Sequence, residues 1–217
     1  MEVNLLIWKG KSCNFFSLWR FGGAYLDLDV ISQTSLESIQ EENFACAQRD
    51  DLTFKDSIAC GIIRMEGNYG QHLAEQCLEW VVCIKIQSDT IKVWNFRDFI
   101  TNFNEEEWGW NGPDLITRIL RKSCRLPDRM ASSSITCSNF TILPKDKCYS
   151  IHFTEWPMFF KRKFVDEAMR RTKESFFVHF WNNMSENFTL STSRTSAYTK
   201  LARKFCPNVL QASGNWF

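Results

Sequence analysis

Phe21-Gly-Gly-Ala-Tyr-Leu-Asp-Leu-Asp-Val-Ile31 is the stretch that decides how this chain folds and where its chemistry lies. The glycine pair, Gly22 and Gly23, is typical of the end of a helix, and it predicts that a helix finishes over residues 18–21. The residues that follow, Ala24 to Ile31, are mostly apolar and predict a short buried strand. The order is therefore a helix, a glycine turn and a strand that carries two aspartates.

The two aspartates, Asp27 and Asp29, are the chemical feature of this strand. Side chains two residues apart in an extended chain project to the same side, so the two carboxylates are expected to repel each other. A D-x-D pair in a solvated loop can arise by chance. In this apolar setting it needs a neutralising cation, and hard carboxylate oxygens suit Mn²⁺ or Mg²⁺, which commonly bridge protein carboxylates to nucleotide phosphates.

The remaining patterns predict an α/β fold. A moderate apolar period over 71–84 indicates a helix that leads into a β-rich stretch over 82–94. Pro113 suits a first helical position, and the helix that it opens has an apolar stripe. Arg121 and Lys122 are expected to face water, and Arg118 either to face water or to contact a bound anion. The stripe consists of Leu115, Ile116, Ile119 and Leu120. A last helix is expected from about Ser196 to Phe205, before Pro207.

Composition limits the classes of protein to consider. The chain has 217 residues, 44% of them hydrophobic, which is enough for one compact core. Its 26 basic and 25 acidic residues nearly cancel, so charge gives no reason to expect a nucleic-acid partner. No apolar run is long enough for a membrane span, and the start of the chain has no signal-peptide layout.

Cysteines and sequons favour an oxidising compartment. The nine cysteines lack the paired C-x-x-C spacing of a structural zinc site, and their odd number leaves at least one thiol outside any intramolecular disulfide. Three acceptor patterns for N-glycosylation point the same way, although so short a pattern also recurs by chance. They begin at Asn139, Asn183 and Asn187.

Two blocks in order resemble a known family. The stretch from Phe21 to Ile31 resembles the Gly-Gly-x-Tyr-x-Asp-x-Asp block of retaining glycosyltransferases. Trp108-Gly-Trp-Asn-Gly-Pro-Asp-Leu-Ile-Thr-Arg118 resembles the Trp-Gly-x-x-Gly-Pro-x-x-x-Thr-Arg block of the α-1,4-glycosyltransferases. Several segments between Cys137 and Pro207 resemble the carboxyl-terminal part of sequences in that family.

The resemblance implies a GT-A-like fold and a metal-dependent enzyme that transfers a sugar from a UDP-sugar donor. The transferred sugar would be galactose, N-acetylgalactosamine or N-acetylglucosamine, and the acceptor a galactose-terminated glycan or glycosphingolipid, joined in α-1,4 linkage with retained configuration. Asp29 is then the expected direct metal ligand, and Asp27 contacts the ribose, the sugar or the metal. His179 would complete the metal shell, or else is a hydrogen-bonded core histidine.

The resemblance also implies donor-binding residues. Asn111 and Gly112 precede the helix that begins at Pro113, whose amino terminus favours an anion such as a diphosphate. Trp108, Trp110 and Trp156 offer ring faces for a sugar, but in so aromatic a chain they are more often core. The donor-binding set is expected to be Gly22, Gly23, Tyr25, Asp27, Asn111 and Gly112.

The whole chain, 1–217, is expected to be a single catalytic-domain fragment, with the D-x-D region in 1–40 and the family's carboxyl-terminal region in 95–217. We expect an N-terminally truncated form of a Golgi enzyme, lumenal and held by a type II anchor upstream, with an insertion around 80–95. An inactive relative that only binds sugar or nucleotide is the alternative. A hydrolase using Asp27 and Asp29 as an acid/base pair is less expected, since adjacent carboxylates suit one metal better.

Overall fold

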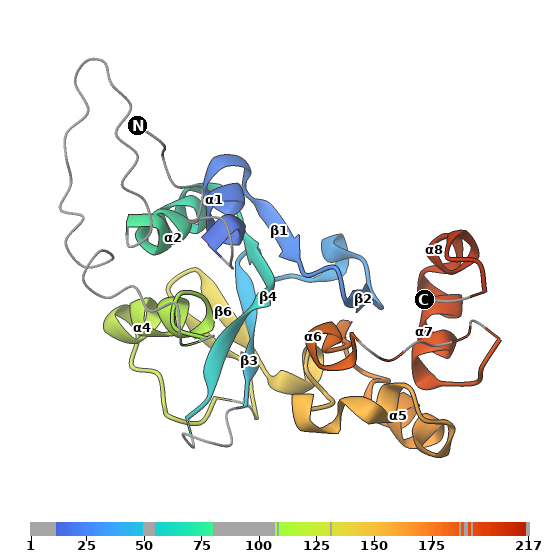
Figure 1. The fold of residues 1–217 in the computed structure, drawn as a ribbon. Helices are drawn as coiled ribbons and strands as arrows, with labels where there is room; N and C mark the ends of the chain where they lie inside the picture. Colours follow the sequence, from blue (N-terminus) through green and yellow to red (C-terminus); the bar gives the residue numbers. More distant parts are fainter. Residues whose placement is uncertain are drawn as a thin grey trace, which may run out of the picture.

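A mixed β-sheet covered by helices on both faces forms the centre of the computed structural model (Figure 1). The structure describes residues 12–49, 55–79, 107, 109–130, 132–186, 188, 191 and 193–215. The five strands lie in the order β1-β4-β3-β6-β5, with β3 and β6 parallel and the other pairs antiparallel. The strands are β1 (Gly23–Leu26), β3 (Phe44–Gln48), β4 (Ser57–Met65), β5 (Ile135–Cys137) and β6 (Phe140–Leu143).

Helices α1, α2 and α4 pack on one face of this sheet (Figure 1). Strand alternation sends Ala45 and Ile142 into the core on this face, while Cys46 and Leu143 enter the core on the other. The helices are α1 (Ser12–Phe21), α2 (Gly67–Glu79) and α4 (Pro113–Ser123).

The opposite face carries the second core, which is formed mainly by the carboxyl-terminal elements, with Ile31 and Ile39 contributed from nearer the amino terminus. A two-stranded sheet pairs β2 (Val30–Ser32) with β7 (Phe177–His179) in antiparallel register. Around it lie α5 (Val165–Arg171), α6 (Asn182–Ser185), α7 (Ala197–Phe205), α8 (Pro207–Ala212) and the 3-10 helices η2 (Leu36–Ser38), η3 (Lys145–Lys147), η4 (Phe153–Phe159) and η5 (Arg162–Phe164). Within the described residues, no helix is both long and apolar enough to cross a bilayer.

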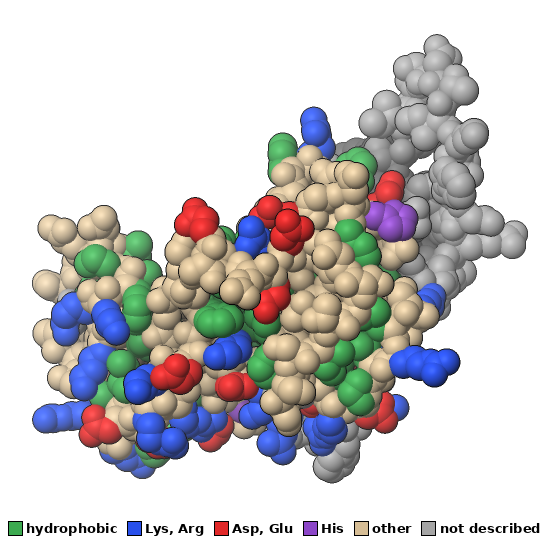
Figure 2. All heavy atoms as spheres, turned by 180° about the vertical axis from the view of Figure 1, so that it is seen from behind, with side chains coloured by type: hydrophobic (Ala, Val, Ile, Leu, Met, Phe, Trp, Pro, Cys, Tyr) green, Lys and Arg blue, Asp and Glu red, His purple; other side chains and the backbone are tan. Residues whose placement is uncertain are grey.

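Although basic and acidic residues nearly balance in the sequence, the basic side chains are unevenly distributed over the surface. On the face shown in Figure 2, Lys and Arg side chains gather over the carboxyl-terminal part of the chain. The exposed basic residues of that part include Lys161, Arg162, Lys163, Arg170, Lys173, Lys200, Arg203 and Lys204.

Local sequence signals placed several elements correctly. Helix α1 ends at Phe21, and Gly22, at φ 66°, donates its N–H to the Leu18 carbonyl. Helix α4 begins at Pro113 with the predicted stripe buried, and α7 begins after Ser196, whose side chain caps it in a capping box. The helix predicted over 71–84 begins earlier, at Gly67, and is described as far as Glu79. The β-rich stretch over 82–94 and the insertion around 80–95 lie outside the described residues.

Two details of the prediction were wrong. The strand expected from Ala24 to Ile31 is two strands in different sheets, because the chain turns at Leu28 and Asp29, where the Val30 N–H reaches the Asp27 carbonyl at 3.2 Å. Arg118 does not face water: its guanidinium lies 4.4 Å from the centre of the Trp110 ring and donates to the Trp110 carbonyl.

Two disulfides tie the elements together. Cys46 in β3 is bonded to Cys148, 102 residues away, and Cys124 after α4 is bonded to Cys137 in β5, 13 residues away. Disulfides of this kind are typical of proteins in an oxidising compartment, and the location of this chain stays a prediction. Among the described cysteines, Cys60, Cys77 and Cys206 are not in a disulfide.

The two disulfides should differ in their effect on stability, because a cross-link that closes a longer loop removes more entropy from the unfolded chain. Cys46→Ala with Cys148→Ala is expected to lower the free energy of unfolding by about 5 kcal/mol, and Cys124→Ala with Cys137→Ala by about 3 kcal/mol. Urea unfolding of the two double variants under non-reducing conditions measures both values. A smaller loss for the 46–148 pair would contradict this ordering.

Candidate metal and donor site

Asp27 and Asp29 lie where the chain passes from the five-stranded sheet to the two-stranded sheet. The Asp27 N–H donates to the Gly61 carbonyl of β4 at 2.8 Å, and the Asp29 carbonyl accepts from the Phe180 N–H at 3.0 Å. One aspartate is thus fixed by each sheet. Leu28, between them, is fully exposed.

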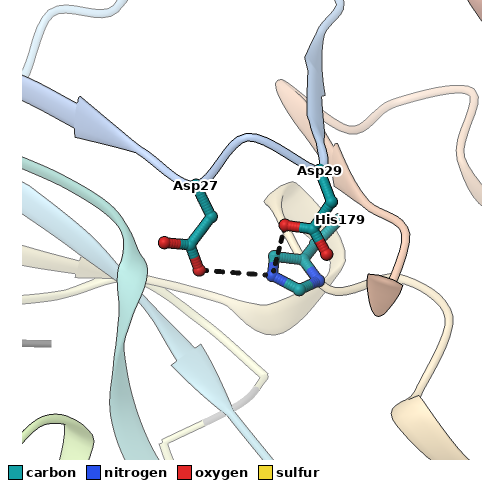
Figure 3. Close-up of side chains that lie close together, drawn as sticks. All are labelled: Asp27, Asp29 and His179. Carbon is teal, nitrogen blue, oxygen red and sulfur yellow. Dashed lines mark ion pairs between the residues drawn. The ribbon is translucent and has the colours of Figure 1, made fainter. Parts of the chain in front are cut away.

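His179 points at both carboxylates from β7 (Figure 3). Its Nε2 lies 3.5 Å from Asp27 Oδ2 and 3.4 Å from Asp29 Oδ1, and one potential ligand atom from each of the three residues lies within 4.8 Å of the other two. The register explains the approach, since Val30, next to Asp29, pairs directly with His179. The predicted metal-ligand set is therefore brought together.

Each of the three side chains is oriented by a hydrogen bond. The Tyr25 hydroxyl donates to Asp27 Oδ1 at 2.8 Å, and the Asn182 backbone N–H donates to Asp29 Oδ2 at 2.7 Å. The Trp181 backbone N–H donates to His179 Nδ1 at 3.1 Å, from a residue in the left-handed region at φ 58°. These contacts leave Asp27 Oδ2, Asp29 Oδ1 and His179 Nε2 facing one another.

A glycine makes room for the Asp27 carboxylate. A Cβ added at Gly61 would lie 2.5 Å from Asp27 Oδ2 and 3.3 Å from the hydroxyl of Tyr149. Any side chain at position 61 must therefore displace the carboxylate that faces His179.

The three residues line a cavity of about 870 Å³, large enough for a sugar nucleotide. Its wall combines aromatic rings, acidic groups and Arg49. Besides the three residues, the lining includes Tyr25, Leu28, Gly61, Glu107, Gly109, Pro113, Asp114, Tyr149, Phe153, Trp181, Asn182, Asn183 and Met184.

The donor set fits a divalent cation of the Mn²⁺ class. Two carboxylates and one imidazole supply hard oxygen ligands and one nitrogen, and the cavity beside them has room for the remaining ligands. The Trp181 contact requires a lone pair on Nδ1, so the neutral ring carries its proton on Nε2. A cation needs the Nε2 lone pair, so binding it requires the other tautomer and the loss of the Trp181 contact.

Not every predicted donor residue lines this cavity. Tyr25 does, through the side chain that holds Asp27, but Gly22 and Gly23 lie at the end of α1 and the start of β1 and are not in the lining. Asn111 and Gly112 are also absent from it, whereas Gly109 in the preceding turn and Pro113 and Asp114 at the start of α4 line it. A donor-binding role for the four residues outside the lining stays a prediction.

For Trp156 the structure supports the core interpretation over the sugar-binding one. Trp156 packs against Phe160 and Phe188 in the core, and Trp108 lies outside the described residues. Among the described tryptophans, Trp181 lines the cavity, and its position in the sequence gave no separate signal for this role.

The sequons also differ in their positions. Asn139 is exposed in the turn between β5 and β6, Asn183 is exposed on α6 and lines the cavity, and Asn187 lies outside the described residues. Glycosylation of each stays a prediction.

Sequence reasoning missed Gly61, Tyr149 and Asn182 as parts of the site. Gly61 is one small residue within an apolar strand, and Asn182 acts through its backbone, so neither gives a signal in the sequence. Tyr149 follows the disulfide-bonded Cys148 and lies in a segment that resembles the family, and this resemblance is the signal that could have indicated a functional role for Tyr149.

Comparison with known proteins gives a consistent result. The family model described as "Alpha 1,4-glycosyltransferase conserved region" matches residues 90–213, which include His179. The chain is 29% identical over 208 residues to alpha-1,4-N-acetylglucosaminyltransferase from Homo sapiens, covering 95% of this chain and 52% of that protein. It is 26% identical over 200 residues to lactosylceramide 4-alpha-galactosyltransferase from Homo sapiens, covering 90% of this chain and 47% of that protein.

The same enzyme from Pongo pygmaeus is 25% identical over 198 residues, which cover 90% of this chain and 76% of that protein. The chain thus spans about half the length of the two human relatives. No solved structure matches it.

Gly61→Ala should weaken Mn²⁺ binding by roughly tenfold or more, because the new methyl group pushes Asp27 Oδ2 away from His179, and changes beside metal ligands commonly cost 10- to 100-fold in metal affinity. Isothermal titration of the full chain with Mn²⁺ measures the affinity. The matched control is Gly109→Ala, whose Cβ would press on Asp114 Oδ2 at 2.7 Å instead, and which should leave Mn²⁺ affinity unchanged. Equal affinities for both variants would contradict the role of Gly61.

Proposed function

The chain belongs to the alpha 1,4-glycosyltransferase family, and we propose that it transfers a hexose from a UDP-sugar to a galactose-terminated glycan or glycosphingolipid. The new bond is an α-1,4 linkage, formed with retained configuration. The transferred sugar is galactose, N-acetylgalactosamine or N-acetylglucosamine. The observation that carries the proposal is the convergence of Asp27, Asp29 and His179 on one point in a cavity of about 870 Å³.

In this proposal the three side chains hold a divalent cation, Mn²⁺ or Mg²⁺. Such an ion supplies electrostatic stabilisation for the charge that develops on the leaving diphosphate. The chain's own residues fix the geometry: Tyr25 orients Asp27, and the Asn182 N–H orients Asp29. The acceptor hydroxyl bonds to the anomeric carbon from the face on which the bond to the diphosphate breaks, and its proton passes to the departing phosphate oxygen, which gives retention.

The proposal includes a lumenal location in the Golgi. The two disulfides suit an oxidising compartment, and the exposed sequons at Asn139 and Asn183 are accessible to a glycan.

Asp29→Asn should lower turnover by about 100-fold or more, because the amide keeps an oxygen for the Asn182 N–H but lacks the charge that holds a cation. UDP release from UDP-galactose and the N-acetylhexosamine donors, with a lactose-terminated acceptor and Mn²⁺, measures the rate. Asp166→Asn, at an exposed position in the first turn of α5, is the matched control and should keep the wild-type rate.

Each of the other outcomes is informative. An unchanged rate in Asp29→Asn, or in the wild type after the metal is chelated, contradicts the metal role. UDP release that no acceptor increases indicates a hydrolase. Donor binding without any release indicates the inactive, binding-only alternative.

A glycan on Asn183 is expected to hinder the reaction, because this exposed residue lines the cavity and an N-glycan is bulky. When the chain is produced through a secretory pathway, Asn183→Gln should raise kcat/KM for a glycan acceptor several-fold relative to glycosylated wild type. Asn139→Gln removes a sequon in the β5–β6 turn, away from the cavity lining, and should change nothing. Mass spectrometry confirms occupancy of both sites, and equal kinetics for the two variants would refute the idea.

A further inference from the structure

Tyr149 is a buried aromatic residue in the cavity wall, and the proposed reaction assigns no role to its hydroxyl. Only 6% of the residue is exposed, and its ring lies 5.5 Å from the ring centres of both His179 and Trp181. The backbone on its amino-terminal side is fixed by the Cys46–Cys148 disulfide and by the hydrogen bond from the Tyr149 N–H to the Lys145 carbonyl. Burial of the ring and its contacts with His179 and Trp181 restrict the side chain.

The hydroxyl of Tyr149 lies close to the carboxylate pair. The position of a Cβ on Gly61 is 3.3 Å from this hydroxyl and 2.5 Å from Asp27 Oδ2, so the two oxygens flank the same small space. The Asp27 carboxylate already accepts a hydrogen bond from Tyr25 on its other oxygen. Two tyrosine hydroxyls therefore lie beside the Asp27 carboxylate: that of Tyr25 on the Oδ1 side and that of Tyr149 on the Oδ2 side.

The phenol of Tyr149 is a neutral hydrogen-bond donor, because a tyrosine O–H keeps its proton at neutral pH. Asp27 and Asp29 offer only acceptor oxygens when ionised, so a phenolic O–H supplies a neutral donor at their side. A sugar diphosphate presents many acceptor oxygens, and a donor that adds no charge suits it beside a cation site.

We infer that Tyr149 is a positioning residue, whose hydroxyl donates a hydrogen bond to an oxygen of the bound sugar diphosphate beside Asp27. The inference rests on the proposed function, because it requires a sugar-nucleotide donor in this cavity. It differs from the role of Tyr25, whose hydroxyl orients a metal ligand.

Tyr149→Phe tests the role, because it removes the hydroxyl and retains the ring that packs against His179 and Trp181. Mn²⁺ affinity should stay within about twofold of wild type, whereas affinity for UDP-galactose in the presence of Mn²⁺ should fall about fivefold, the usual effect of one neutral hydrogen bond. Titration calorimetry of the full chain measures both, and the melting temperature checks that the variant is folded. Repeating the titration with UDP alone assigns the bond: an equal loss indicates a diphosphate oxygen, and a smaller loss indicates a sugar oxygen.

The matched control is Tyr25→Phe, which removes the hydroxyl that donates to Asp27 Oδ1 and should therefore weaken Mn²⁺ binding itself. Wild type that fails to bind a UDP-sugar would refute the proposed function. Wild type that binds, with Tyr149→Phe binding equally well, would refute only the role of Tyr149. A loss of Mn²⁺ affinity in Tyr149→Phe as large as in Tyr25→Phe would also overturn it, because the hydroxyl would then support Asp27 rather than the donor.

Discussion

Repulsion between two carboxylates at the junction of two sheets is the constraint on which the site depends. The backbones of Asp27 and Asp29 are fixed by different sheets, through hydrogen bonds to Gly61 and Phe180, so the chain cannot separate the two residues without breaking one of these bonds. Each carboxylate has one oxygen held by a neutral donor and a second that faces His179. Because the two carboxylates repel each other, the binding of a cation between them is favoured.

Local signals explain why part of the fold was predictable. The glycine pair after Phe21, Pro113 at the start of a helix and Ser196 as a cap each act within one turn of chain, so a single sequence contains all that is needed. The prediction of one strand from Ala24 to Ile31 was wrong because local sequence does not decide this feature. Its alternation of apolar residues is the same whether the chain stays in one sheet or turns at Leu28, and only the partners β4 and β7 decide between them.

The rest of the site could not be predicted, because it is assembled from distant segments. Gly61 comes from β4, Tyr149 follows a disulfide-bonded cysteine and Trp181 follows β7. The family resemblance covers the segments of Tyr149 and Trp181, but it does not say which side chains reach the cavity. The pairing of Cys46 with Cys148 spans 102 residues and is one of many that nine cysteines allow. His179 was found through the resemblance, and its approach to Asp29 is a matter of strand register.

The fully exposed side chain of Leu28 has an evolutionary consequence. It lies between the two aspartates and borders the cavity, yet with so little of its surface buried it contributes almost nothing to the core. Mutations at such a position change stability little, while they alter part of the cavity lining. Position 28 is thus a place where descendants of one ancestral fold can acquire different preferences without first acquiring a compensating change elsewhere.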